Sequence, residues 1–261
     1  MTQALIMATL GTLFTFFMTS AGAATVYFFK REPSENITRV FLGFAAGVMI
    51  AASVWSLLIP AIDMTEEAQR IGWIPAAGGF LIGVFFLLIL DSLIPHLHPD
   101  SNETEGIETN WKRSTLLVTA VTLHNIPEGM AVGLAFALGV QNGGEYAPAI
   151  ALALGMGIQN FPEGAAISLP LKHEGKTSTQ AFIIGSLSGI VEPIFGIAVV
   201  LIAQYITPLM PWLLSFAAGA MIYVTVEELI PEAHLGEHSH FGTLGVIFGF
   251  IIMMILDVAL G

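Results

Sequence analysis

The sequence has no cysteine and very little charge. Without cysteine the chain forms no disulfides and offers no thiolate metal ligand and no cysteine nucleophile. Charged residues make up only 11% of the 261 residues, whereas 55% are hydrophobic and the mean hydropathy is +0.79. This composition is typical of a multi-span membrane protein. Any metal site must therefore use imidazole, carboxylate, amide or thioether groups.

A long run of one charge sign is also missing. The net charge is −12, but the acidic residues are scattered over short loops and span interiors. The sequence therefore gives no support for nucleic-acid binding. A cleaved signal peptide is disfavoured, because Met1-Thr2-Gln3 has no positive residue and the apolar run continues past the small residues Ala21–Ala24. We expect a retained first helix.

Long apolar runs predict an all-α integral membrane protein, since a transmembrane helix needs about 20 apolar residues. Thr177–Val226 contains one charge, Glu192, and is too long for one span; Pro208 and Pro211 mark its break, because proline disfavours helix continuation. We expect a single transporter domain over residues 1–261. Its eight transmembrane helices are expected at about 4–29, 40–62, 71–91, 114–140, 146–171, 179–205, 209–231 and 241–260.

The positions of lysine and arginine predict the orientation. Seven of the eight lie in odd-numbered loops, and only Arg70 lies in an even-numbered one. Cytoplasmic loops carry the excess of positive residues. The odd loops are therefore expected in the cytosol and both termini outside, in a multi-pass protein of the cell (inner or plasma) membrane.

Short strings recur in the same order along the chain and predict an internal repeat. The second and seventh spans share Phe-Ala-Ala-Gly at 44–47 and 216–219 and, after a one-residue slip, Leu-Ile-Pro at 58–60 and 229–231. The third and eighth spans share two glycines and Leu-Asp, at 90–91 and 256–257. Paired spans have opposite orientation. The pattern predicts a 3+2+3 inverted repeat, an arrangement of secondary transporters with a site near the membrane midplane.

Two pentapeptides inside the fourth and fifth spans carry the chemistry. They read His124-Asn125-Ile126-Pro127-Glu128 and Gln159-Asn160-Phe161-Pro162-Glu163, and each is followed by glycine. A single charge at mid-membrane costs about 2.5–3.5 kcal/mol on insertion scales. Something must compensate for two such clusters, and a bound metal cation is the simplest candidate. Polar residues that only join helices by hydrogen bonds are the alternative.

The spacing within each pentapeptide predicts shared faces. Residues four apart lie on one side of a helix, so His124 with Glu128 and Gln159 with Glu163 can converge on one site. Asn125 and Asn160 point about 100° away and can complete a second site, bridged by the glutamates.

Two further features support an intramembrane site. Pro127 and Pro162 each remove a helical hydrogen bond, which membranes tolerate where the backbone lines a cavity or packs in protein. Glu192, a carboxylate inside the sixth span, is a candidate ligand for the second metal; otherwise it would be protonated.

Other polar residues outline a transport route. Met49 and Ser56 lie seven apart on one face of the second span and can line it. Asp63 and Asp257 would draw in cations at the outer side, and the cytosolic side would hold Asp91, Glu227, Glu228, Glu232 and His234. Each of these can equally be an ordinary helix-end charge. The loop histidines at 96, 98, 238 and 240 can buffer ions loosely or be incidental.

The two motifs, His-Asn-x-Pro-Glu-Gly and Gln-Asn-x-Pro-Glu-Gly, resemble the signature of the ZIP (Zrt/Irt-like) metal transporters. The similarity covers essentially the whole chain, including Met49, Ser56, Glu192 and the Glu-Leu-Ile-Pro-Glu at 228–232, and is greatest to the compact bacterial branch. It implies eight spans and uptake of divalent transition metal into the cytosol. The implied binuclear site comprises His124, Asn125, Glu128, Gln159, Asn160, Glu163 and Glu192.

The resemblance also implies that spans 1, 4, 5 and 6 form a transport bundle, which moves against spans 2, 3, 7 and 8, often in a homodimer. Two departures stand out. Asn160 occupies a position where relatives can carry aspartate, which removes one charge from the second site, and Glu227 stands where a related protein can carry histidine.

Our hypothesis is a facilitative or ion-coupled importer of Zn²⁺, with Fe²⁺, Mn²⁺, Co²⁺ or Cd²⁺ as further passengers, and not an enzyme. Histidine with carboxylates suits zinc and iron, and the lack of thiolate argues against a Cu(I) specialist. The main alternative is an intramembrane metal-dependent hydrolase that activates water, although the His-Glu-x-x-His motif is absent. A metal-gated sensor or structural dimer would bind metal without flux.

Overall fold

The computed structural model describes residues 2–29, 34–68, 71–94, 96–97, 104–105, 113–205, 207–234 and 240–260. Most of these residues are helical. The helices of the first half are α1 (Thr2–Ala23) with η1 (Ala24–Tyr27), α2 (Glu35–Ala52), η2 (Ser53–Leu58), α3 (Ile59–Glu67), α4 (Trp73–Leu93) and α5 (Arg113–Gln141). Those of the second half are α6 (Ala147–His173), α7 (Ser178–Ser188), α8 (Val191–Tyr205), η3 (Thr207–Leu209), α9 (Met210–Val224), η4 (Thr225–Leu229), α10 (Ile230–Ala233) and α11 (Phe241–Leu260). A two-residue antiparallel pair, β1 (His96–Leu97) with β2 (Thr104–Glu105), lies between α4 and α5.

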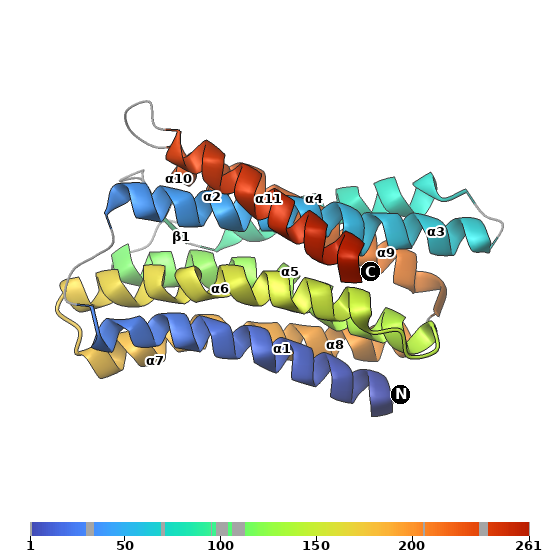
Figure 1. Cartoon of the computed structure of the whole chain (residues 1–261), viewed down its shortest axis with the longest axis horizontal. Helices are drawn as coiled ribbons and strands as arrows, with labels where there is room; N and C mark the ends of the chain where they lie inside the picture. Colours follow the sequence, from blue (N-terminus) through green and yellow to red (C-terminus); the bar gives the residue numbers. More distant parts are fainter. Residues whose placement is uncertain are drawn as a thin grey trace.

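The helices run side by side in one bundle (Figure 1). Helix α2 packs against α11, α4 against α9, α1 against α6, and α5 against α8. Helices α5 and α6, which carry the two pentapeptides, lie in the middle of the bundle and contact helices on both sides. The start of α1 and the end of α11 lie at the same end of the bundle (Figure 1).

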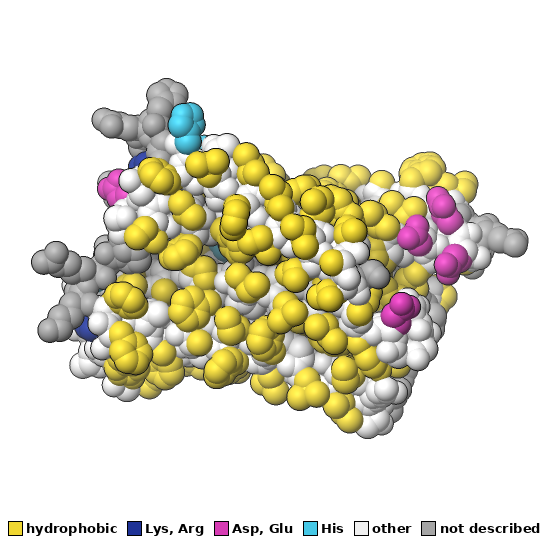
Figure 2. Space-filling model, viewed as in Figure 1, with side chains coloured by type: hydrophobic (Ala, Val, Ile, Leu, Met, Phe, Trp, Pro, Cys, Tyr) yellow, Lys and Arg dark blue, Asp and Glu magenta, His cyan; other side chains and the backbone are white. Residues whose placement is uncertain are grey.

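The outer surface is that of a membrane protein. Six helical stretches in the described part of the chain are long and apolar enough to cross a bilayer: Thr2–Tyr27, Glu35–Glu67, Trp73–Leu93, Ser178–Ala203, Met210–Ala233 and Phe241–Leu260. Figure 2 shows hydrophobic side chains over the length of one face, with charged side chains confined to its two ends. The chain is therefore a multi-pass all-α membrane protein. Helices α5 and α6 contain polar residues at mid-length and are not among the six.

The segment expected as one span at 179–205 is broken in the structure. Helix α7 ends at Ser188 and α8 begins at Val191, with Gly189 and Ile190 in the turn between them. The turn is closed by hydrogen bonds from Gly189 N to Ser186 O and from Glu192 N to Gly189 O, 3.2 and 3.1 Å long. Glu192 thus lies in the first turn of a helix, where the free amide groups and the helix dipole favour a carboxylate.

The one-residue slip in the sequence repeat coincides with two π-helical segments. Segment η2 interrupts the second predicted span with six residues, and η4 interrupts the seventh with five. Each begins with a hydroxyl that bonds back four residues: Ser53 Oγ to Met49 O at 2.7 Å, and Thr225 Oγ1 to Met221 O at 2.8 Å. A π turn accommodates an inserted residue within a continuing helix, and both spans contain one at the position where the sequence repeat slips.

Glycine allows the central helices to approach at backbone distance. A Cβ on Gly164 of α6 would collide with the backbone oxygen of Thr19 on α1, and one on Gly129 of α5 would collide with the backbone of Glu192 on α8. Small residues at helix interfaces permit this packing in membranes, where burial of apolar surface gives little drive for helix association. These two contacts hold α1 and α8 directly against the polar pentapeptides.

Candidate metal centre

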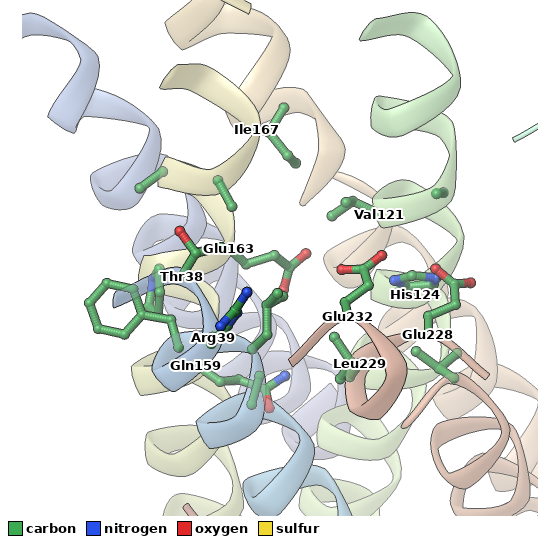
Figure 3. Close-up of a pocket in the computed structure, with 18 of the residues that line it drawn as sticks. Thr38, Arg39, Val121, His124, Gln159, Glu163, Ile167, Glu228, Leu229 and Glu232 are labelled. Carbon is green, nitrogen blue, oxygen red and sulfur yellow. The ribbon is translucent and has the colours of Figure 1, made fainter. Parts of the chain in front are cut away.

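A cavity of about 590 Å³ reaches the polar centre of the bundle. Exposed Glu35, in the first turn of α2, lines its mouth, and buried Met49 lines its interior. Four of the seven predicted ligands lie on its wall: His124, Glu128, Gln159 and Glu163. Figure 3 labels three of them, His124, Gln159 and Glu163. The helical spacing of four therefore places both pairs on faces that meet in one cavity, as the sequence predicts.

A hydrogen bond joins the two pentapeptides inside the cavity. Gln159 Nε2 on α6 donates to Glu128 Oε1 on α5 across 2.8 Å. Both side chains are buried, with exposed fractions of 1% and 2%. The pair brings one amide and one carboxylate into contact from antiparallel neighbours.

His124 has a partner that the pentapeptides do not contain. Its Nε2 lies 2.5 Å from Oε1 of Glu228, which belongs to the π-helical segment η4 (Figure 3). Glu163 interacts electrostatically with His124 and lies beside the Asn125 amide. The imidazole thus links α5 to the seventh predicted span while remaining within reach of the Glu163 charge.

The other three predicted ligands lie behind the cavity wall. Asn125, Asn160 and Glu192 are each 0% exposed. Asn160 Nδ2 donates to Glu192 Oε1 at 3.0 Å, and Asn125 Nδ2 donates to the carbonyl of Ser188 at 3.2 Å. Ser188 ends α7, so the helix break leaves its carbonyl free for this bond. The seven residues therefore divide into a cavity-lining group of four and an enclosed group of three.

The predicted ligands contain most of the unpaired polar atoms of the interior. Of the nine buried side-chain nitrogen or oxygen atoms without a hydrogen-bond partner in the described residues, six belong to the seven predicted ligands. These six are Asn125 Oδ1, Glu128 Oε2, Gln159 Oε1, Asn160 Oδ1, Glu163 Oε1 and Glu192 Oε2. All are acceptor oxygens. An unpaired buried polar group costs about 1–3 kcal/mol, and a cation is a partner that satisfies acceptors alone.

The donor set is mixed in chemistry. Among the described residues, no three or more His, Asp or Glu side chains stand in a group that fits one ion. Three of the seven predicted ligands are amides, so an ion held here would be shared between amide and carboxylate oxygens. Glu128 interacts electrostatically with Glu163 and Glu192. Their assignment as ligands stays a prediction.

The structure separates the predicted route residues into three groups. Met49, Glu228 and Glu232 line the cavity. Ser56 and Asp257 lie away from it and are joined by a 2.6 Å hydrogen bond between Ser56 Oγ and Asp257 Oδ1, with exposed fractions of 6% and 8%. This hydrogen bond links η2 to α11.

The third group lies toward the surface. Asp63, Glu227 and His234 are exposed, and His234 contacts Ile230 O and Thr243 Oγ1 at 2.9 Å. Asp91 is half-buried and accepts a 2.9 Å hydrogen bond from Tyr223. Of the loop histidines, 98 and 238 lie outside the described residues, the side chain of His96 is not described, and His240 is exposed.

Two sets of residues at this centre were not predicted. Arg39 lines the cavity and lies 3.6 Å from Glu35, one turn away on α2. Thr15 and Thr19 of α1 are fully buried and hydrogen-bond Glu192. The threonines have a sequence signal, because Thr12, Thr15 and Thr19 recur at helical spacing in an otherwise apolar span. Arg39 has no such signal and reads as an ordinary helix-end charge.

Comparison with known proteins identifies the family of this fold and site. The family model described as ZIP Zinc transporter matches residues 2–113 and 96–257. The chain belongs to the ZIP family. The resemblance of the two pentapeptides to the ZIP signature is thereby confirmed.

Individual ZIP relatives match over most of their length. Zinc transporter ZIP11 of Xenopus tropicalis is 38% identical over 97% of this chain and 96% of its own. Zinc transporter GufA of Myxococcus xanthus is 37% identical over 84% of this chain and 86% of its own. Zinc transporter ZIPB of Bordetella bronchiseptica is 36% identical over 88% and 74%. The similarity thus includes the whole helical bundle.

Proposed function

We propose that this ZIP-family chain transports divalent transition-metal ions, Zn²⁺ foremost, across the cell membrane into the cytosol. The six unpaired acceptor oxygens on the predicted ligands carry the proposal. A set of acceptors that lacks donors, in the middle of an apolar bundle, matches a cation better than any neutral solute. The relatives named as zinc transporters support zinc as the passenger.

The proposed membrane arrangement has eight spans. Helices α5 and α6 are 29 and 27 residues long and lie inside the bundle, so we add them to the six apolar spans. They would form the central pair of the 3+2+3 inverted repeat. The matching π-helical segments of the second and seventh spans support this repeat.

The proposed orientation places the cavity mouth in the cytosol. The described lysines and arginines, among them Arg39, Lys172 and Lys176, lie at the bundle end opposite the chain termini. Exposed acidic residues, including Asp63 and Glu145, lie at the end that holds the termini. Positive residues favour the cytoplasmic side. The cavity begins near Glu35 and Arg39, so the described conformation would be the one that releases ions inward.

The two residue groups suggest two ion positions. His124, Glu128, Gln159 and Glu163 would hold the ion next to the cavity. Asn125, Asn160 and Glu192 would hold a second ion behind it, with Glu128 or Glu163 shared between them. Divalent N/O sites of this kind select Zn²⁺, Fe²⁺, Mn²⁺, Co²⁺ and Cd²⁺ only weakly from one another.

Transport would proceed by alternating access. In the proposed orientation, the Ser56–Asp257 hydrogen bond would help to close the outer side in the described conformation. An ion from outside would pass Asp63, Asp257, Ser56 and Met49 to reach the ligands, and leave past Glu228 and Glu232. The close contact of His124 with Glu228 lies on this inward path, so metal and Glu228 would exchange at the imidazole.

Flux into proteoliposomes tests the function. Purified protein is reconstituted with a Zn²⁺-sensitive dye inside, and Zn²⁺ is added outside. We expect a saturable signal that falls by at least about tenfold in Glu128→Gln with Glu163→Gln, because even partners of metal ligands are worth tenfold or more in affinity. The control Glu145→Gln changes a carboxylate in an exposed loop and should leave flux at the wild-type level.

The same preparation separates the alternatives. Bound Zn²⁺ without flux would indicate a sensor or structural protein and would overturn the transport proposal. Equal flux in the wild type and the double variant would remove the pentapeptides from the transport path.

A further inference from the structure

The carboxylate of Glu192 is held by groups on three different helices. Its Oε1 accepts hydrogen bonds from Thr19 Oγ1 of α1 at 3.3 Å and from Asn160 Nδ2 of α6 at 3.0 Å. Thr15 of α1 is a further hydrogen-bond partner of this carboxylate. Its Oε2 has no partner, although Glu192 is 0% exposed. One oxygen is therefore saturated and the other is free.

The hydroxyls of Thr15 and Thr19 also have backbone carbonyl acceptors on their own helix, and a purely structural role would need only these. Thr15 Oγ1 lies 3.0 Å from Thr12 O, and Thr19 Oγ1 lies 3.3 Å from Thr15 O, so each hydroxyl can bond back to its own helix. A hydroxyl has one proton to donate. A carboxylate is the stronger acceptor, because charge-assisted hydrogen bonds are roughly twice as strong as neutral ones. Glu192 and the backbone carbonyls therefore compete for the same hydroxyl protons, and an ionised Glu192 is the stronger acceptor.

We infer that Thr15 and Thr19 of α1 are positioning residues, which together with the Asn160 amide hold the Glu192 carboxylate so that Oε2 is its oxygen left for a metal ion; Thr19 and Asn160 do so through Oε1. The inference deepens the proposed function and rests on it. It also assigns a consequence to asparagine at position 160: its Nδ2 donates to Glu192, so only its Oδ1 remains for an ion.

The packing of α1 supports a fixed geometry for this arrangement. A Cβ on Gly164 would collide with the Thr19 backbone, and one on Gly189 would lie 3.0 Å from both Thr19 Oγ1 and Glu192 Oε1. Helix α1 also packs against α5, α6, α7 and α8. The hydroxyls are therefore held by glycine contacts at positions where a larger residue would displace them, and they stay with Glu192 if these helices move together.

The test compares isosteric substitutions on one face of α1. Thr19→Val keeps the side-chain shape and removes the hydroxyl, whereas Thr19→Ser keeps the hydroxyl. Thr12→Val is the matched control, because Thr12 is equally buried and bonds only to backbone, at Ala8 and Thr9. The measurements are bound Zn²⁺ per protein by mass spectrometry, Zn²⁺ affinity by calorimetry, and KM and kcat of Zn²⁺ flux.

We expect Thr19→Val to weaken one class of Zn²⁺ binding by about tenfold, the usual size of an effect on a ligand's hydrogen-bond partner. Thr19→Ser should restore most of this affinity, and Thr12→Val should match the wild type. In a Glu192→Ala background, Thr19→Val should cause no further loss of flux, because its effect acts through that carboxylate.

Two results would overturn the inference. If Thr19→Val and Thr12→Val weaken binding equally, or if Thr19→Val still lowers flux without the Glu192 carboxylate, the threonines only pack. If the wild-type protein neither binds nor carries Zn²⁺, the proposed function itself is wrong and the positioning role falls with it.

Discussion

Two buried amide side chains of α6 use their NH₂ group in a hydrogen bond and leave their carbonyl oxygen unpaired. Gln159 and Asn160 each donate their amide NH₂ to a glutamate and keep a free carbonyl oxygen. Buried amides normally satisfy both ends. Here neighbouring residues of one helix repeat the same half-satisfied pattern toward two different carboxylates. The pattern is what a site needs when its remaining partner is a cation.

Among the described residues that line the cavity, Arg39 is the one lysine or arginine, and the acidic ones include Glu163 and Glu232 (Figure 3). Its side chain is only 14% exposed, whereas that of its ion-pair partner Glu35 is 90% exposed. A fixed positive charge near the mouth repels a divalent ion, so in the proposed orientation Arg39 would oppose the return of the ion from the cytosol.

We expect Arg39→Gln to let Zn²⁺ on the cytosolic side inhibit uptake at concentrations about three- to tenfold lower, since a unit charge about 10 Å from a divalent ion contributes about 1 kcal/mol in a water-like dielectric. The check is flux into proteoliposomes preloaded with graded Zn²⁺. Lys176→Gln removes an exposed cation outside the cavity and serves as control. If inhibition by Zn²⁺ is the same in Arg39→Gln and the wild type, the guanidinium has no electrostatic effect on the ion. High salt should reduce a difference in inhibition that is caused by the charge.

At the scale of the helices, proline and glycine have different effects on helix continuity. Helices α5 and α6 run through Pro127 and Pro162 without ending, whereas the sixth predicted span ends and restarts at Gly189. The proline-bearing helices are covered by neighbours on both sides, which tolerates a lost hydrogen bond. The break at Gly189 supplies both a free carbonyl for Asn125 and a helix N-terminus for Glu192.

Gly164 should be intolerant of a side chain. Gly164→Ala places a Cβ against the Thr19 backbone oxygen, which cannot swing aside as a side chain can. Overpacking costs about 1–3 kcal/mol, more than the up to about 1 kcal/mol of helix propensity that alanine gains. We expect a lower unfolding midpoint in detergent, measured by intrinsic fluorescence.

Gly72→Ala is the matched control for this prediction. A Cβ at Gly72 would meet only side-chain atoms of Glu66 and Ile62, at 3.0 to 3.2 Å. These atoms can shift by a few tenths of an ångström, so the midpoint should stay within error of the wild type. A Gly164→Ala protein as stable as Gly72→Ala would show that α1 and α6 can separate at no cost.

At the scale of the molecule, charge is divided between the two ends of the bundle. The described lysines and arginines lie at the end opposite the chain termini, whereas exposed acidic residues lie at both ends, with Asp63 and Glu145 at one and Glu35 and Glu174 at the other. This distribution of lysine and arginine supports the proposed orientation, because positive residues favour the cytoplasmic side of a membrane.

The absence of native cysteine allows a direct test of this orientation. Glu145→Cys lies in the loop between α5 and α6, and Glu174→Cys lies at the end of α6; both positions are exposed. A membrane-impermeant maleimide applied to intact cells should label Glu145→Cys and leave Glu174→Cys unlabelled until the cells are opened. The opposite labelling would invert the proposed orientation and with it the direction of uptake.

Much of the fold and part of the site could be predicted from the sequence alone. Apolar runs indicated a multi-pass all-α protein, and the pentapeptides indicated the ZIP family; both predictions are confirmed. The spacing of four also predicted that His124 and Glu128 share a face of one helix. Periodicity of 3.6 residues determines such faces, because it depends only on local backbone geometry.

What the sequence determined by itself was therefore the membrane class, the family and the polar face of each central helix. Only the tertiary structure decided the partners across helices: Glu228 for His124, Thr19 for Glu192, and Arg39 at the cavity mouth. The physical reason is that helix–helix packing in a membrane is set by close backbone contacts at glycine and by complementary polar pairs. The His124–Glu228 and Thr19–Glu192 contacts join residues 104 and 173 positions apart, and a local sequence pattern carries no information about such pairs.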